Sequence, residues 1–322
     1  MFVSDRVVFM ELHKTACTHI RDILNGLLVG ELRGKHNQAT AELFEGQHVF
    51  FGSVRDPWEW YVSLWAYGCD RRGSLYSSVT KERSAVRELD WKSNPKGALL
   101  EAFGLRKRDP AAWRSTYADV NDAAAFRAWL RMMHDAQRKG DIGVGYSSSG
   151  VSRVAGLMTY RYLKLFCTKS GALKALDRLN TLELIRAYEQ KRCFIDHFIR
   201  NESLELDLFD GLTKHGVDFD AAARTTAHGL PKTNTSSRQH GVAYYYDEET
   251  AALVAQSERL IIEKFGYQAP VALSETQPQA SLQAAAVPQM LVWLPALGSV
   301  LDTMASWAEL GTDSASMLLA LS

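Results

Sequence analysis

The sequence lacks the features that mark several classes of protein. No apolar run reaches the roughly 18 residues of a membrane-spanning helix, so no membrane span is expected. The charged pair Asp5 and Arg6 comes too early for the long apolar core of a signal peptide. Neither sign of charge is in excess, since Lys plus Arg and Asp plus Glu number 37 each. We expect no nucleic-acid partner, because non-specific binding to nucleic acid needs a basic excess.

Cysteine is scarce as well. The chain has 4 cysteines, far apart in the sequence and without a C-x-x-C pair: Cys17, Cys69, Cys167 and Cys193. This pattern indicates reduced thiols rather than a disulfide framework, so we predict a cytoplasmic protein. His13, Cys17 and His19 do not indicate zinc, because a strand–helix turn points their side chains in different directions. We therefore expect no metal site.

The stretch of residues 7–20 carries the strongest local signal. An apolar run of strand length, Val7 to Leu12, is followed by a polar loop with Lys14, Thr15 and Thr18, and then by apolar residues at helix spacing. This order places backbone N–H groups and the positive end of a helix dipole beside the lysine. It predicts an anion site, most naturally for phosphate.

The loop differs from two known phosphate motifs. It has neither G-x-x-x-x-G-K-[ST] nor G-x-G-x-x-G, and Ala16 and Cys17 stand where glycines would be expected. Taken alone, it also fits a surface turn with a solvated lysine. A second element has to decide between these interpretations.

A second apolar run, residues 48–54, predicts a parallel strand covered on both faces. Arg55 follows it, and Pro57 suits the first turn of a helix that continues from Trp58 to Tyr67. Ser63 lies within this helix. Because ligands bind at the carboxyl ends of strands in open α/β sheets, Arg55 is placed to meet the loop of residues 13–18.

The remainder of the chain is less informative. Residues 69–141 are predicted to be a helical insertion, either solvated or acting as a lid over an acceptor, with a helix from Asp122 to Gln137. A strand is expected at residues 193–199, and a periodic helix from Asp247 to Phe265 ends at Gly266.

Beyond Tyr267 the composition changes. Residues 268–288 are predicted to be a linker, and residues 289–322 an apolar helical appendage. The appendage is expected to pack on the body or on a second subunit, which leaves a homo-oligomer open, or to attach to a membrane surface.

Three stretches together resemble the sulfotransferases that use 3′-phosphoadenosine 5′-phosphosulfate (PAPS), in particular the carbohydrate-type members. The loop from His13 to Thr18 is similar to the family's 5′-phosphosulfate loop, Pro-Lys-Thr-Gly-(Gly/Ser/Cys)-Thr. Arg55, followed 8 residues later by Ser63, is similar to its 3′-phosphate motif. Residues 246–267 resemble the last helix of many members. The loop departs from the family at its first residue, which is histidine instead of proline, and in its middle, where alanine and cysteine are still small.

The resemblance covers roughly residues 5–68 and 190–267. It implies an α/β fold with a central parallel sheet flanked by helices, the P-loop-like sulfotransferase fold, in a domain of residues 1–267. It also implies the transfer of a sulfuryl group from PAPS to a hydroxyl of a carbohydrate or small metabolite, in line and with a general base.

The resemblance also assigns site residues. The 5′-phosphate side would be held by the loop and the helix start: Lys14, Thr15, Ala16, Cys17, Thr18 and His19. Arg55 and Ser63 would hold the 3′-phosphate, and Arg238, together with Lys232, would add a basic clamp. Lys14 is also expected to act in catalysis. His36 and Glu11 are alternative candidates for the general base.

Two other functions fit the same residues. One is a non-catalytic nucleotide-binding or scaffold protein that keeps the fold and uses its C-terminal helices for partner assembly. The other is a kinase-like phosphotransferase, against which the absence of the Walker lysine argues.

Overall fold

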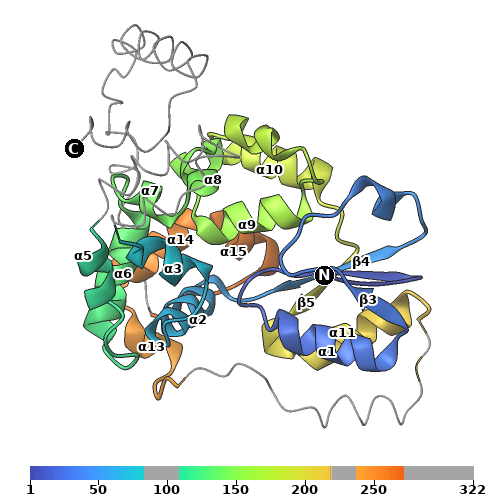
Figure 1. Cartoon of the computed structure of the whole chain (residues 1–322), viewed down its shortest axis with the longest axis horizontal. Coiled ribbons are helices and arrows are strands. Elements are labelled where there is room, and N and C mark those ends of the chain that lie inside the picture. Colours follow the sequence, from blue (N-terminus) through green and yellow to red (C-terminus); the bar gives the residue numbers. More distant parts are fainter. Residues whose placement is uncertain (83–108, 218, 220–236, 272–322) are drawn as a thin grey trace, which may run out of the picture. The chain divides into compact units, whose positions relative to one another are not determined.

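The computed structural model describes residues 1–82, 109–217, 219 and 237–271 and contains a five-stranded mixed sheet flanked by helices (Figure 1). The strands are β1 Phe2–Ser4, β2 Val7–Met10, β3 Gly30–Leu32, β4 Val49–Val54 and β5 His197–Arg200. The α/β class is thereby confirmed. The predicted appendage at 289–322, most of the predicted linker at 268–288 and part of the predicted insertion at 69–141 lie outside the described residues.

The sheet is mixed, which corrects the prediction of a parallel sheet. Its strand order is β3-β1-β2-β4-β5. β2 pairs in parallel with β4, and β4 with β5, whereas β1 pairs antiparallel with both β2 and β3. β1 and β2 are joined only by Asp5 and Arg6, and so short a connection permits only an antiparallel hairpin. The Ser4 hydroxyl accepts a hydrogen bond from the Val7 N–H at 2.9 Å and so fixes this turn.

The α-helices are α1 Cys17–Leu27, α2 Pro57–Cys69, α3 Ser74–Thr80, α5 Pro110–Ser115, α6 Ala123–His134, α7 Lys139–Ile142, α8 Val144–Ser147, α9 Leu157–Phe166, α10 Leu182–Arg192, α11 Leu204–Lys214, α13 Val242–Tyr245, α14 Glu248–Ser257 and α15 Arg259–Phe265. Short 3-10 helices cover Ala41–Phe44, Gly150–Arg153, Leu173–Arg178 and Asn201–Ser203. Within the described part of the chain, no helix is long and apolar enough to span a membrane.

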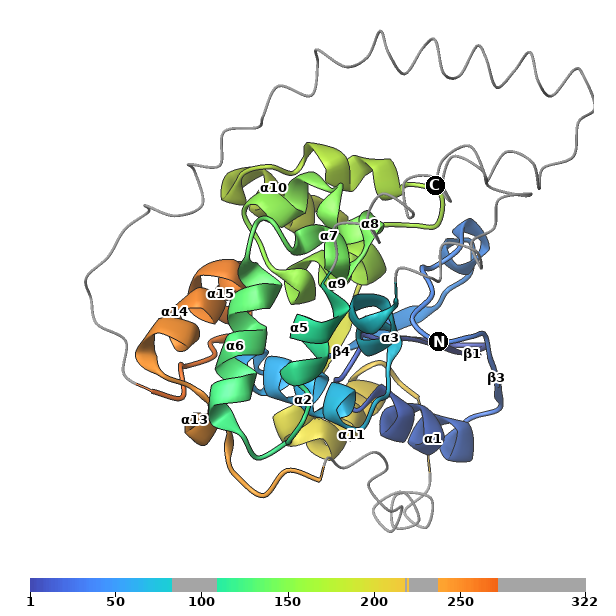
Figure 2. The ribbon, with the colours of Figure 1, turned by 60° about the vertical axis from the view of Figure 1, so that its left-hand side comes forward.

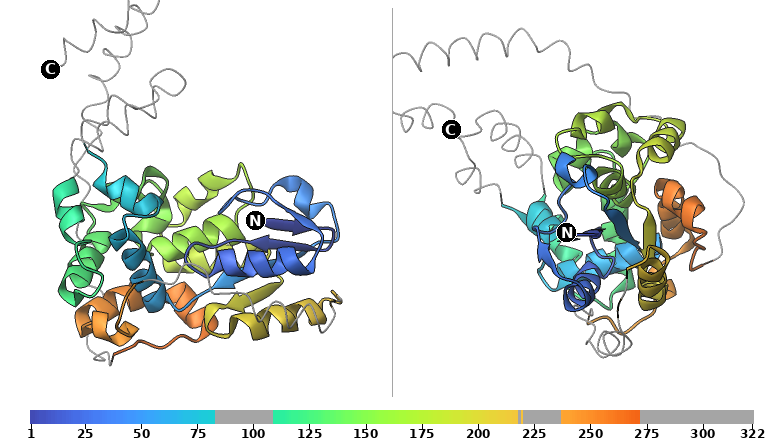
Figure 3. Two further views of the ribbon diagram at one scale, coloured as in Figure 1. Left: turned by 60° about the horizontal axis from the view of Figure 1, so that its bottom comes forward. Right: turned by 90° about the vertical axis from the view of Figure 1, so that its right-hand side faces the viewer.

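Both faces of the sheet are covered, because side chains along a strand alternate between its faces. Val7 and Phe9 of β2 belong to an apolar cluster with α1 and α11, and Val8 and Met10 belong to a larger cluster that includes α2 and α9. Figure 3 shows α1 and α11 next to each other. The sheet is therefore sandwiched between helices, and its strand ends are held from both sides.

Several helix boundaries follow local chemistry. Asp56 caps α2 by accepting from the Glu59 N–H at 3.0 Å, with Pro57 at the first helical position as predicted. Gly266 ends α15 in the left-handed conformation with φ 71°, also as predicted. The single helix expected from Asp247 to Phe265 is instead two helices, which meet at Glu258.

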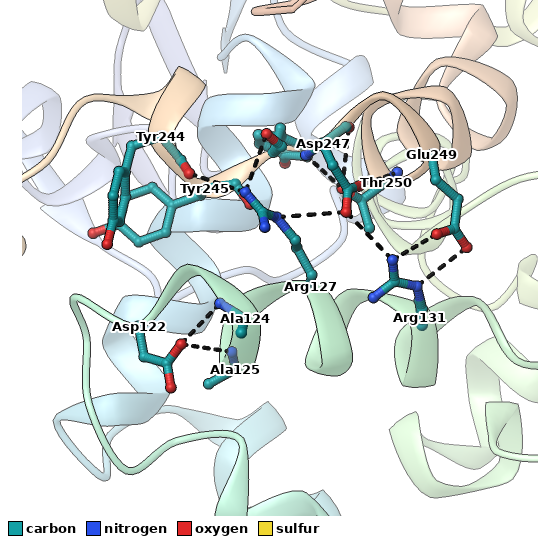
Figure 4. A network of polar contacts seen from close by, with 11 residues as sticks. Asp122, Ala124, Ala125, Arg127, Arg131, Tyr244, Tyr245, Asp247, Glu249 and Thr250 are labelled. Carbon is teal, nitrogen blue, oxygen red and sulfur yellow. Dashed lines mark hydrogen bonds and ion pairs between the residues drawn. The ribbon is translucent and has the colours of Figure 1, made fainter.

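Helix α6 is attached to the segment α13–α14 by a polar network. Arg131 forms ion pairs with Asp247 and Glu249, and the Arg127 Nε donates to the Tyr245 carbonyl at 3.0 Å (Figure 4). The Asp247 carboxylate also accepts from the Thr250 N–H in a capping box. Figure 2 shows α6 between α5 on one side and α14 on the other. The network thus ties residues that are more than a hundred positions apart in the sequence into one helical layer.

Candidate functional site

A cavity of about 970 Å³ opens where β2, β4 and β5 end. Most of the residues expected at the site line it: Lys14, Ala16, Cys17, Thr18, His19, His36, Arg55, Ser63 and Arg238. The carboxyl ends of parallel strands meet at one sheet edge, so segments far apart in the sequence converge there. Thr15 and Glu11 are not among the lining residues.

The loop between β2 and α1 has positive-φ residues of the kind that form anion nests. Lys14 has φ 62° and Ala16 has φ 56°, both left-handed, whereas Thr15 between them is not. Alternation of left- and right-handed residues turns successive N–H groups toward one point, where an anion can bind. Ala16 also precedes the first turn of α1 and brings the positive end of that helix to the same point.

Thr15 holds the loop to the sheet. Its hydroxyl donates to the Leu12 carbonyl at 2.8 Å and lies 2.6 Å from the Ser53 hydroxyl on β4. Both side chains are fully buried. Thr15 was expected to contact a phosphate, but in this structure its hydroxyl is used inside the protein.

Lys14 is half-buried beside the loop and has its ammonium 4.0 Å from the centre of the Tyr67 ring. Burial lowers the pKa of Lys14 to about 8, and the positive charge of Arg55 acts in the same direction. A bound anion would offset both effects, because an opposite charge favours the protonated amine. The Lys14 side chain is thus prepared for an anionic partner.

Arg55 and Arg238 form a second cationic centre. Both guanidinium groups contact the carboxylate of Glu59, at 2.5 Å from Arg55 and 3.1 Å from Arg238. The Arg55 Nε and the Arg238 Nη1 are buried and have no hydrogen-bond partner in the described structure. Because an unsatisfied buried donor is costly, these two atoms are suited to an anionic acceptor. Ser63, on α2, lines the same cavity.

His36 is oriented by a backbone contact. Its Nδ1 lies 3.0 Å from the Glu11 carbonyl oxygen, and its ring stacks on His13 with centroids 3.6 Å apart. A carbonyl can only accept, so Nδ1 carries the proton and Nε2 keeps a lone pair. Burial lowers the pKa of His36, which keeps the ring neutral at pH 7. His36 therefore has the protonation state that a general base requires.

Glu11, the other candidate base, is almost fully buried, at 1% exposed. Its carboxylate lies 3.4 Å from the Met1 amino group. Glu11 therefore contributes its backbone carbonyl to the orientation of His36, and its side chain is directed elsewhere.

The start of α1 gives the cavity a polar wall. The Lys35 ammonium donates to the Thr18 hydroxyl at 3.2 Å, and the His19 Nε2 lies 3.9 Å from a Glu205 oxygen. Burial raises the pKa of the Cys17 thiol to about 11, so Cys17 is a poor nucleophile at neutral pH. The structure gives Cys17 the role of a small residue beside the loop.

Arg161 on α9 was not predicted from the sequence, although it lines the cavity. Its Nη1 is buried without a hydrogen-bond partner, and none of the ion pairs among the described residues involves it. The sequence offered a weak signal, a charged residue within a largely apolar segment, and the structure shows that eight of the ten residues of α9 are buried. Lys35, Tyr67 and Arg72 also line the cavity and were missed.

No family model, no curated protein and no solved structure matches this chain. Its chemistry is therefore inferred from the cavity. The cavity can neutralise an anion at the nest and Lys14, hold a second anion near Arg55, and accept a proton at His36. The Lys232 predicted for the basic clamp lies outside the described residues.

Proposed function

We propose that this protein is a sulfotransferase that transfers a sulfuryl group from PAPS to a hydroxyl of a carbohydrate or another small molecule. One observation carries the proposal: an anion nest with its lysine and a separate pair of arginines line one cavity of about 970 Å³. PAPS has anionic groups at both its 5′ and 3′ positions, which matches two cationic centres better than a ligand with one. On this proposal the mixed sheet and its flanking helices form a P-loop-like sulfotransferase fold.

The nest and Lys14 suit the 5′ side of PAPS. When bound, PAPS supplies an activated sulfuryl group on its 5′-phosphate. The loop amides and the Lys14 ammonium would stabilise the negative charge that develops on the bridging oxygen as the S–O bond breaks. Fixed donors of this kind act without reorganisation, which is the main source of catalysis in the related phosphoryl transfers.

Arg55, Ser63 and Arg238 suit the 3′-phosphate. The unpaired Arg55 Nε and Arg238 Nη1 supply buried donors, and charge-assisted bonds to a phosphate are among the stronger hydrogen bonds in proteins. Glu59 holds both guanidinium groups in place. This carboxylate would position the arginines. Its negative charge would also weaken their attraction for an anion that cannot reach their unpaired donors.

His36 would act as the general base. Its Nδ1 is committed to the Glu11 carbonyl, so Nε2 can take the proton of the acceptor hydroxyl as the new O–S bond forms. His13, which stacks on His36, is also uncharged, because burial lowers its pKa. Between the two bases considered, the geometry favours His36, because the Glu11 side chain does not line the cavity.

Two measurements test this function. The first compares the unfolding temperature with 3′-phosphoadenosine 5′-phosphate and with AMP, each at about 1 mM; we expect the bisphosphate to stabilise the protein by several degrees more. The second follows transfer of sulfur-35 from labelled PAPS into a pool of sugar acceptors. Lys14→Ala should abolish transfer. Arg186→Ala, which removes an equal charge from an exposed ion pair on α10, should leave it unchanged.

The outcomes separate the alternatives. Equal stabilisation by AMP and the bisphosphate would refute PAPS as the ligand. Selective binding of the bisphosphate without transfer to any acceptor would instead support a non-catalytic binding protein. Protection by ATP that depends on magnesium would support a phosphotransferase.

A further inference from the structure

Two cysteines outside the cavity lie side by side. Cys167 ends α9, and Cys193 ends α10. The Phe194 N–H donates to the Phe166 carbonyl at 3.0 Å, which brings the two cysteine-bearing segments together. Both sulfur atoms and a Glu189 oxygen lie within 4.8 Å of one another. A disulfide needs Cα atoms about 4.4–6.8 Å apart, a separation typical of residues on backbone segments joined in this way.

The surroundings make one thiol reactive. A hydrogen bond with Cys167 lowers the pKa of Cys193 to about 7, and the positive charge of the Lys264 ammonium acts in the same direction. Cys193 is half-buried, whereas Cys167 is buried and its pKa is raised. This combination is typical of a reactive thiol beside a resolving thiol.

The same atoms are less suited to a metal ion. The Glu189 carboxylate already accepts, through one oxygen, from the Lys264 ammonium at 2.6 Å and from the Tyr162 hydroxyl at 2.8 Å. A divalent ion would have to compete with the lysine for this carboxylate and would lie close to its positive charge. Thiol chemistry requires no such displacement.

We propose that Cys193 and Cys167 are a peroxide-sensitive pair that closes to an intramolecular disulfide. In the first step the Cys193 thiolate attacks hydrogen peroxide; an S–O bond forms, the O–O bond breaks, and hydroxide leaves and takes a proton from solvent to become water. In the second step the Cys167 thiol attacks the Cys193 sulfenic acid; the S–S bond forms, the S–O bond breaks, and the leaving hydroxide takes the Cys167 proton and departs as a second water. The two thiols lose two electrons, and the peroxide is reduced.

The bond would join two walls of the cavity. Helix α9, which Cys167 ends, carries Arg161, and Cys193 leads into β5, after which Asn201 to Glu205 line the cavity. Oxidation would fix the C-terminal end of α9 to the segment that leads into β5. The chemistry of the two thiols does not depend on the proposed transfer reaction.

The test treats the reduced full chain with a small excess of hydrogen peroxide and maps its peptides without reduction. We expect a mass loss of about 2 Da and a peptide that joins Cys167 to Cys193. Cys193→Ser should abolish both. Cys167→Ser should leave a sulfenic acid at Cys193 that dimedone labels, which keeps the test decisive even if the disulfide itself is unstable. Cys69→Ser is the matched control, because Cys69 is also half-buried but its pKa is raised to about 12, and this variant should react as the wild type does.

Three outcomes would overturn the proposal. Cys69 could react as fast as Cys193, which would mean that the surroundings of Cys193 do not raise its reactivity toward peroxide. Cys193 in the wild type could proceed to sulfinic acid without a link to Cys167. Zinc could bind with one ion per chain, lost in both serine variants, which would make the pair a metal site.

Discussion

Lys14 is the residue on which the proposed anion site most depends, and its pKa lies close to neutral pH. Burial and the nearby charge of Arg55 lower its pKa to about 8 in the free protein. A bound phosphate favours the ammonium form, so binding takes up a proton when the pH lies above this value. The affinity for the bisphosphate should therefore depend on pH in a range where phosphates themselves no longer titrate.

We expect the affinity for 3′-phosphoadenosine 5′-phosphate to be level near pH 7 and to fall by up to about tenfold per unit once the pH exceeds about 8. Calorimetric titrations across this range measure the effect. Lys14→Arg is the control, since arginine stays protonated and should give a flat profile. An equally steep fall in Lys14→Arg would assign the titration to another group.

His36 should affect the reaction rather than binding. His36→Ala should reduce the rate of sulfuryl transfer by about 10²–10⁴-fold, the usual contribution of a general base. The Kd for the bisphosphate should stay nearly the same, because on the proposed function His36 would face the acceptor. Single-turnover transfer and equilibrium binding, measured on one preparation, separate the two effects. A loss of binding as large as the loss of rate would make His36 a structural residue.

Ala16 holds a left-handed conformation, with φ 56°, that glycine adopts more readily. Ala16→Gly should therefore raise the free energy of unfolding by about 0.5–1 kcal/mol after the entropy cost of a glycine is subtracted. Ala16→Val should lower it. Urea unfolding of both variants measures the effect. If Ala16→Gly were clearly destabilising, the loop conformation described here would be wrong.

Residue by residue, the sequence was most informative where chemistry is local. Apolar runs predicted that Lys14 and Arg55 follow strands and that Ser63 lies in the helix after the second of them. All three line the cavity. The orientation of Thr15 could not be read, because its hydroxyl is directed by Ser53 on another strand. The same limit applies to Glu11, whose carboxylate is directed by a contact outside the motif.

At the scale of elements, the one helix predicted from Asp247 to Phe265 is two helices that meet at Glu258. Its buried carboxylate accepts from the Tyr61 hydroxyl at 2.6 Å and from the Thr159 N–H at 2.8 Å and so caps the start of α9. Burial raises the pKa of Glu258 to about 7. The apolar period from Asp247 to Phe265 contains no hint of this break or of the contact that Glu258 makes with a residue about a hundred positions away.

Glu258→Ala should lower the free energy of unfolding by about 3 kcal/mol or more, because several buried donors lose their acceptor. Glu263→Ala, which breaks an exposed pair with Arg186 on the neighbouring helix surface, should cost less than about 1 kcal/mol. Urea unfolding at pH 7.5 compares the two. Similar costs for both variants would contradict the capping role.

The sheet also shows which strands can be predicted from the pattern of apolar residues alone. The apolar runs at residues 7–12 and 48–54 predicted β2 and β4 nearly to the residue. β1 and β3 have three residues each, too short for an alternation to be recognised, and β3 is exposed. Their antiparallel pairing made the sheet mixed, but it left the strand ends that position the cavity where a parallel pair would place them.

At the scale of the whole molecule, the cavity is formed by segments that are far apart in the sequence. Arg161 reaches it from α9, which was not predicted, and Arg238, which the resemblance placed at the site, reaches it from a segment near the end of the described chain. On the proposed function, the two cationic centres would distinguish a bisphosphate from a nucleotide with a single phosphate. Each should contribute separately, since Lys14 would contact a group common to both ligands, and Arg55 a group that only the bisphosphate has.

The most direct test is therefore the ratio of the Kd for AMP to the Kd for 3′-phosphoadenosine 5′-phosphate, measured by calorimetry in three proteins. The wild type should prefer the bisphosphate by about 10- to 100-fold, the value of one or two charge-assisted bonds. Arg55→Ala should bring the ratio close to one, whereas Lys14→Ala should weaken both ligands and keep the preference. A wild-type ratio near one, or an Arg55→Ala variant with an unchanged ratio, would contradict the bisphosphate site.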